Sequence, residues 1–194
     1  DSLLEDHLVD LLLDVAQSGE NVVEREGLSI RHASRFILIG SGNPEEGELR
    51  PQLLDRFGLS VEVLTPDTVD ERIEVIKRRD DYDKNPDDYA ATWDKENRKL
   101  RNKIQKARKS LGSITVDSKI LEHCAQICID LGSDGLRGEL TLVRTARALA
   151  AFNGKERVDV GHIKTIAPMA LSHRLRRDPV SYTHLRAHET PAHL

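Results

Sequence analysis

The sequence predicts an α/β segment followed by an all-α segment. Residues 36–39 form a continuous apolar run closed by small residues, which is typical of a strand buried on both faces of a parallel sheet. Residues 59–63 alternate between apolar and polar side chains, which is typical of a second strand. From residue 117 onward, apolar residues recur at helical spacing. This change of pattern within 194 residues indicates two domains.

The composition excludes several classes of protein. Hydrophobic residues make up 38% of the chain but aromatic residues only 4%, so the core must be built from Leu, Ile, Val and Ala. Two cysteines, 12 glycines and seven prolines exclude a disulfide framework and a collagen-like chain. No apolar stretch approaches the ~18 residues of a membrane span, and the first residues lack the basic start of a signal peptide. We therefore expect a soluble, intracellular protein without a membrane span.

The first predicted element is an amphipathic helix that ends at Gly19, because the apolar residues before it are spaced three and four apart. Two short apolar runs on either side of Glu26 predict a β-hairpin within residues 22–36. The strand expected next, over residues 36–43, ends in small polar residues. Ligands of parallel sheets bind beyond the carboxyl ends of the strands, so residues 40–44 form a candidate site.

A charged segment follows a short predicted helix over residues 49–57 and the strand at 59–63. Residues 71–109 hold 13 Lys/Arg and 9 Asp/Glu, a charge of +4, so the rest of the chain carries −8 within the total of −4. We interpret residues 65–112 as a solvated helical linker that starts near Pro66. The alternative is a phosphate-binding stripe for nucleic acid, against which the interleaved acids and the few nearby aromatic rings argue.

Three helices are predicted after the linker, over residues 117–131, 138–152 and 160–177. Asp117 and Asp159 stand where N-caps are expected. These helices predict a small helical bundle.

The other features of this half predict structure rather than a metal site. Cys124 and Cys128 share one helical face in a C-x3-C spacing that is unusual for metal or redox pairs, so we expect two buried thiols. Pro168 should kink the last helix. The histidines are scattered, which predicts no metal site. Residues 180–194 break every pattern and resemble a translated sequencing adapter, so we expect a non-native tail.

Asn43 and Arg56 suit the hydrolysis of a nucleoside triphosphate. A polar amide at the tip of a strand can orient the attacking water, and an arginine can stabilise the charge that develops on the γ-phosphate. The same spacing fits a structural interpretation equally well. In that case Asn43 caps a turn, and Arg56 pairs with Asp55 or Glu62.

Longer motifs carry a resemblance to a known family. Residues 4–10, 42–47 and 53–58, and later 132–140 and 170–179, resemble subunit I of magnesium chelatase, an ATPase of the AAA+ class. The resemblance covers residues 2 to about 179. It implies the C-terminal part of an AAA+ parallel-sheet core with a β-hairpin insertion, followed by a helical lid.

The resemblance also implies domain limits and residue roles. It divides the chain into a partial AAA+ core (1–64), the linker, and a lid (113–179). Asn43 would be the sensor 1 residue, Arg56 the arginine finger that reaches the nucleotide of a neighbouring subunit, and Arg137 the sensor 2 arginine. An arginine suits this role because its planar fork stays charged and can donate two hydrogen bonds.

The function implied by the resemblance is that of a motor subunit. A ring, typically a hexamer, would use ATP with Mg²⁺, dock on the D subunit and drive the porphyrin-binding H subunit to insert Mg²⁺ into protoporphyrin IX. The resemblance implies that the protein is located in the bacterial cytoplasm, or in the chloroplast stroma of a plant or alga. The alternatives are a MoxR-like AAA+ remodelling ATPase and, in another class, a helical nucleic-acid-binding module.

Two motifs of the family are absent from the printed sequence. It contains no glycine-rich phosphate loop with its Lys and Ser/Thr, and no apolar strand ending in Asp-Glu. The resemblance therefore implies a C-terminal fragment of a longer ATPase, and we expect no ATP turnover by these residues alone.

Overall fold

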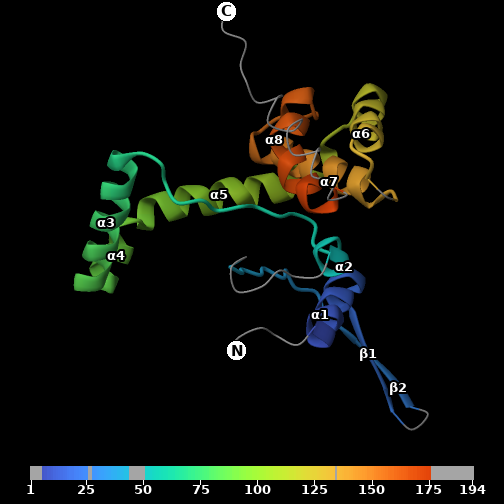
Figure 1. The fold of residues 1–194 in the computed structure, drawn as a ribbon, viewed down its shortest axis with the longest axis horizontal. Helices are drawn as coiled ribbons and strands as arrows, with labels where there is room; N and C mark the ends of the chain where they lie inside the picture. The colour runs from blue at the N-terminus through green and yellow to red at the C-terminus, as the bar shows by residue number, and fades with distance from the viewer. Residues whose placement is uncertain (1–5, 26–27, 44–50, 134, 176–194) are drawn as a thin grey trace, which may run out of the picture. The chain divides into compact units, whose positions relative to one another are not determined.

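The computed structural model describes residues 6–25, 28–43, 51–133 and 135–175. The chain divides into two compact units, Asp1–Gly58 and Leu59–Leu194. Figure 1 labels their helices and strands. The division falls close to the predicted limit at residue 64, while the finer partition into core, linker, lid and tail stays a prediction.

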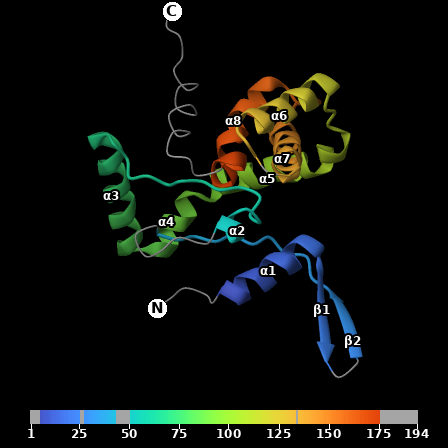
Figure 2. The same cartoon turned by 45° about the vertical axis from the view of Figure 1, so that its right-hand side comes forward.

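The first unit begins with the predicted amphipathic helix and hairpin. Helix α1 (Asp6–Ser18) ends at Gly19, whose φ of 72° lies in the left-handed region that favours glycine. Strands β1 (Glu20–Arg25) and β2 (Leu28–Ala33) then pair antiparallel, with Glu20 opposite Ala33 and Arg25 opposite Leu28. Figures 1 and 2 both show the hairpin continuing directly from the end of α1. The predictions of both elements are confirmed.

A small core holds α1 against helix α2 (Pro51–Leu54). Val9 and Leu13 from α1 and Leu53 from α2 are buried, and Leu38 and Phe57 pack against them. The predicted helix over residues 49–57 is thus only one turn long where the structure describes it, because the chain turns away after Leu54.

The predictions of strands over residues 36–43 and 59–63 are wrong. Both segments lie outside any strand, and Ile37 and Ile39 are 89% and 88% exposed. A strand exists only with a hydrogen-bonded neighbour, and among the described residues the one sheet is the β1–β2 hairpin. An apolar run without a neighbouring strand therefore forms no strand of its own.

The charged segment of the second unit is helical, as predicted. Thr68 caps helix α3 (Val69–Lys84) by accepting a hydrogen bond from the Glu71 N–H. Asn85 caps helix α4 (Pro86–Thr92) in the same way, and helix α5 (Asp94–Ser110) follows. None of these three helices contains a buried residue, which fits their charge.

A helical bundle completes the second unit. The 3₁₀ turn η2 (Leu111–Ser113) leads to α6 (Ser118–Asp130), α7 (Arg137–Phe152), α8 (Val160–Leu171) and the 3₁₀ turn η3 (Ser172–Arg174). Figure 2 shows α6, α7 and α8 gathered together. They share one core, whose largest fully buried side chains are Leu142, Ile163, Ile166, Leu171, Cys124 and Cys128.

The last helix is shorter than predicted. Helix α8 ends at Leu171 rather than near residue 177. Pro168 lies inside it and has no N–H to donate, and the Ser172 N–H bonds to the Pro168 carbonyl as the chain tightens into a 3₁₀ turn. The missing donor weakens the helix where it stops. The predicted non-native tail at 180–194 lies outside the described residues.

Candidate functional site

Arg56 is held by one face of α1. Its Nη1 lies 2.8 Å from Asp10 Oδ1 and 2.8 Å from Asp14 Oδ1, forming an ion pair with each carboxylate. Gln17 Nε2 donates a hydrogen bond of 3.1 Å to the backbone carbonyl of Arg56. Helix α1 therefore holds both the side chain and the backbone of this residue.

Sequence reasoning missed these partners. It offered Asp55 or Glu62 as the structural partner of Arg56, because both are close in sequence, whereas Asp14 is 42 residues away. A local signal exists: residues 10, 14 and 17 follow an i, i+4, i+7 spacing, which places them on one face of a helix. The identity of the residue that this face meets can come only from the fold.

Asn43 belongs to the same unit as Arg56. It ends segment 34–43, which forms neither helix nor strand, and it is exposed. A Cβ added to Gly40 would lie 3.8 Å from Phe57 Cζ, so the segment that leads to Asn43 runs beside the turn that carries Arg56. The structure thus brings together the two segments that bear the predicted sensor 1 residue and arginine finger.

Arg137 lies in the second unit and is the first residue of α7. It is exposed at the N-terminal end of the helix, where the direction of the backbone N–H groups favours an anion. Gly138 next to it is buried. The lack of a side chain at Gly138 lets the first turn of α7 approach α6 and α8 closely.

The two cysteines are buried, as predicted. The exposed fractions of Cys124 and Cys128 are 1% and 0%. Burial, together with the nearby Glu139 carboxylate, raises the pKa of Cys124 and raises the pKa of Cys128 to about 12. Both thiols therefore stay protonated near neutral pH and pack as small apolar groups.

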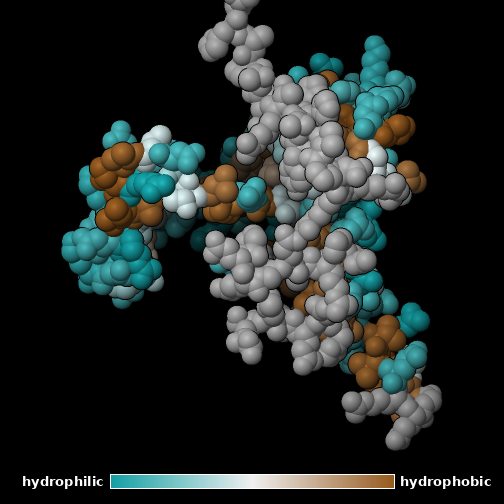
Figure 3. Space-filling model, in the orientation of Figure 1, coloured by the Kyte–Doolittle hydropathy of each residue, from teal (hydrophilic) through white to brown (hydrophobic). Residues whose placement is uncertain are grey.

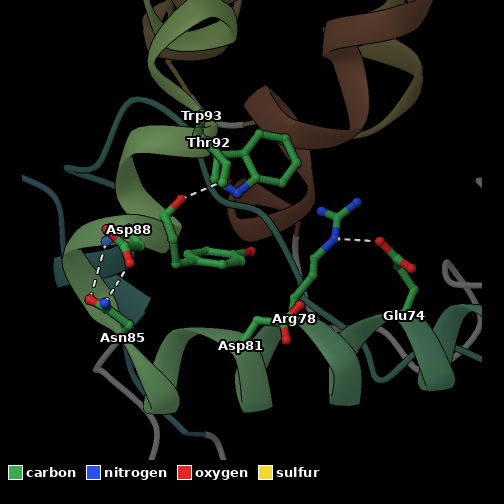
Figure 4. Close-up of a pocket in the computed structure, with 8 residues that line it drawn as sticks. Glu74, Arg78, Asp81, Asn85, Asp88, Thr92 and Trp93 are labelled. Carbon is green, nitrogen blue, oxygen red and sulfur yellow. Dashed lines mark hydrogen bonds and ion pairs between the residues drawn. The ribbon is translucent and has the colours of Figure 1, made fainter.

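A shallow cavity of about 400 Å³ lies between α3 and α4. Figure 4 shows Arg78 projecting from α3 toward Trp93, with Glu74 on the other side of Arg78. Arg78 Nε donates to Glu74 Oε1 at 2.8 Å, and its guanidinium lies 5.0 Å from the centre of the Trp93 ring. Figure 3 shows hydrophobic and hydrophilic residues mixed over the surface of α3 and α4. The ion pair lies within α3, and the contact between Arg78 and Trp93 joins α3 to the end of α4.

Among residues 6–25, 28–43, 51–133 and 135–175, no group of three His, Cys, Asp or Glu side chains could hold a metal ion. Within those same ranges, no helix is long and apolar enough to cross a membrane.

Known proteins and one protein family are similar to this chain. Residues 121–191 match the AAA lid domain family. This match extends into residues 180–194. That these residues are a non-native tail stays a prediction. A crystal structure of a candidate ATPase from Cytophaga hutchinsonii aligns with a TM-score of 0.60 and 19% identity, covering 92% of this chain and 57% of the other. At this identity the likeness concerns the fold, and it supports an α/β part followed by a helical lid.

Curated relatives are much closer in sequence. The magnesium-chelatase 38 kDa subunit of Cereibacter sphaeroides is 65% identical over 179 residues, which are 92% of this chain and 54% of that protein. The subunit of the same name from Rhodobacter capsulatus is 64% identical, with 92% and 51% covered. The chloroplastic magnesium-chelatase subunit ChlI-1 of Arabidopsis thaliana is 51% identical, with 92% and 42% covered.

The chain spans about half the length of the curated relatives it matches. The relatives carry chelatase names, so a MoxR-like remodelling ATPase is not favoured. The resemblance indicated by the sequence motifs is confirmed: over 92% of its length the chain is similar to magnesium-chelatase 38 kDa subunits, and residues 121–191 match the AAA lid domain.

Proposed function

We propose that this chain is part of the ATPase motor subunit of a magnesium chelatase, a ligase that forms nitrogen–metal bonds. The motor couples hydrolysis of ATP with Mg²⁺ to the insertion of Mg²⁺ into protoporphyrin IX by partner subunits. The observation that carries this proposal is the 65% identity to a magnesium-chelatase subunit across 92% of the chain. The close packing of the Asn43 and Arg56 segments in one unit supports it.

Each proposed site residue has a chemical task. Asn43 orients the attacking water as sensor 1, because its amide can both donate and accept hydrogen bonds. Arg56 acts as the arginine finger on the γ-phosphate of a neighbouring subunit's nucleotide. Arg137, at the exposed start of α7, acts as the sensor 2 arginine.

The proposed partners follow from the same role. A finger that acts on a neighbour requires a homo-oligomeric ring, which we propose to be a hexamer. The ring docks on the chelatase D subunit and, through it, on the porphyrin-binding H subunit. We propose that the protein is located in the bacterial cytoplasm, or in the chloroplast stroma of a plant or alga.

The nucleic-acid alternative rests on α5, which carries eight basic and two acidic side chains. Two of the basic groups take part in contacts within the chain. Lys103 Nζ lies 3.9 Å from the centre of the Phe152 ring, and Lys99 pairs with Glu96 at 3.9 Å. We therefore propose no nucleic-acid partner; binding of DNA that weakens steeply with salt would contradict this.

The proposed function is tested with a chimera in which this chain replaces the matched 179 residues of the Cereibacter sphaeroides subunit. The chimera is assayed with D and H subunits, ATP, Mg²⁺ and protoporphyrin IX. We expect chelation in the unmodified chimera, and a loss of about 10³-fold in ATPase kcat for Arg56→Ala. Arg79→Ala is the matched control, because Arg79 is an exposed arginine of α3. Full ATPase and chelation by the Arg56→Ala chimera would refute the assigned role.

A further inference from the structure

One face of α1 is built around Arg56. Asp10, Asp14 and Gln17 line this face, and all three contact Arg56. The adjoining stripe of α1, Val9 and Leu13, is buried in the small core of this unit. The core fixes the rotation of α1 about its axis, and this rotation directs the two carboxylates at the guanidinium.

The same core also fixes the turn that bears Arg56. Leu53 is buried against Val9 and Leu13, and Phe57 packs on the same cluster. Arg56 N–H donates to the Leu53 carbonyl at 3.1 Å, so the residue is tied to the end of α2. The ion pairs therefore join two elements whose backbones are already held in place by apolar packing.

The contacts use the guanidinium in a specific way. Both carboxylates meet the same nitrogen, Nη1, at 2.8 Å. A guanidinium has five N–H donors in one rigid plane, and Nη1 supplies two of them. Holding Nη1 at two points fixes the direction of the plane, and with it the direction of the donors on Nη2 and Nε. The Arg56 side chain remains 33% exposed, so the group reaches solvent.

We propose that Asp10 and Asp14 are positioning residues that aim Arg56 at the phosphate of a neighbouring subunit's nucleotide. The proposal rests on the proposed function of Arg56. A long arginine side chain loses rotamer freedom when it binds, and a side chain aimed in advance has less to lose. Small errors in the placement of a catalytic group can reduce a rate by up to about 10²-fold.

A structural role for the same ion pairs makes a different prediction. Half-exposed ion pairs contribute little to stability, so their loss should change unfolding only slightly. If the two carboxylates acted on the rate by a route that does not involve Arg56, their removal would act equally with and without the Arg56 side chain. If they aim Arg56, their removal matters only while Arg56 is present.

The test uses the chimera described above, assembled with its partner subunits. The double change Asp10→Asn and Asp14→Asn keeps the shape of both side chains and removes their charge. We expect ATPase kcat to fall about tenfold, with KM for ATP within about twofold, because the finger acts on charge that develops in the transition state. Asp67→Asn, the same substitution at an exposed position outside this face, should match the unmodified chimera.

The same double change in an Arg56→Ala chimera completes the cycle, with single-turnover rates as the readout. We expect no further loss there. An equal loss in both backgrounds would overturn the proposal, since the carboxylates would then act independently of Arg56. An unchanged or increased kcat for the double variant, beside a low kcat for Arg56→Ala, would overturn it and leave the function of Arg56 standing. An unchanged kcat for Arg56→Ala would refute that function, and the positioning role would fall with it.

Discussion

At the scale of the residue, Gly138 decides how closely the start of α7 packs. A Cβ at this position would lie 2.8 Å from Ser133 Oγ, 3.2 Å from Leu171 Cδ2 and 3.3 Å from Cys128 Sγ. The first of these distances is shorter than real Cβ contacts, and the site is buried, so neighbouring groups would have to shift. Gly138 thus links the position of Arg137 to the core of the lid.

We expect Gly138→Ala to destabilise the chain by about 1–3 kcal/mol, because overpacking forces the neighbouring side chains out of place. Urea unfolding followed by circular dichroism measures this. Gly112→Ala is the matched control, since nothing lies within 4 Å of its added Cβ, and a change within about 0.5 kcal/mol is expected. Equal stability of both variants would contradict the close packing.

At the scale of the element, the start of α8 depends on a reciprocal cap. Asp159 Oδ1 accepts a hydrogen bond of 3.0 Å from the His162 N–H, and the Asp159 N–H donates to His162 Nδ1 at 3.1 Å. His162 is buried at 5% exposure. The His162 N–H lowers the pKa of the Asp159 carboxyl below its ordinary 3.8, because the hydrogen bond favours the charged form.

The lowered pKa of Asp159 predicts a pH dependence. Its stabilising contribution is fully present above pH 3.8 and is lost as the pH falls through the lower pKa of the folded state. Asp159→Asn keeps an oxygen acceptor but cannot ionise. We expect the melting temperature of the parent to exceed that of this variant at pH 7, with the gap closing below pH 3.8.

Asp159→Ala tests the cap itself. It removes the acceptor at every pH, so its melting temperature should lie below that of Asp159→Asn even in acid. Thermal unfolding between pH 7 and pH 3 gives both comparisons. A gap between the parent and Asp159→Asn that stays constant down to pH 3 would contradict the ionic part of the cap.

At the scale of the whole molecule, the two units contain extended segments without secondary structure. Residues 34–43 belong to the first unit and residues 59–67 to the second. Val61, Val63 and Leu64 are 63%, 90% and 71% exposed. In contrast, helices α6 to α8 surround a core of fully buried side chains.

We expect thermolysin, which cleaves before apolar residues, to cut first within residues 34–43 and 59–67. Cleavage needs an exposed segment that can fit the enzyme's active site, whereas α6 to α8 must first unfold. Mass spectrometry of a digestion time course locates the cuts. First cuts within residues 118–171 would contradict the stability assigned to the lid.

Much of this fold follows from local patterns in the sequence. Apolar spacing predicted α1, α6 and α7, Gly19 marked the end of α1, and the two runs around residue 26 predicted the hairpin. These features depend on residues only a few positions apart, so a linear pattern suffices to indicate them. Motifs in the right order also indicated the family, which the relatives confirmed.

Only the tertiary structure decided the features that join distant residues. The partners of Arg56 are 42 and 46 positions away, and the sequence pointed instead to its neighbours Asp55 and Glu62. The runs at 36–43 and 59–63 have strand-like patterns but no partner strand among the described residues. A pattern states which face of an element is apolar, whereas ion pairs and sheet ladders need a second element in place. The sequence by itself thus determined the helices, the hairpin and the family, and the fold decided which residues hold Arg56.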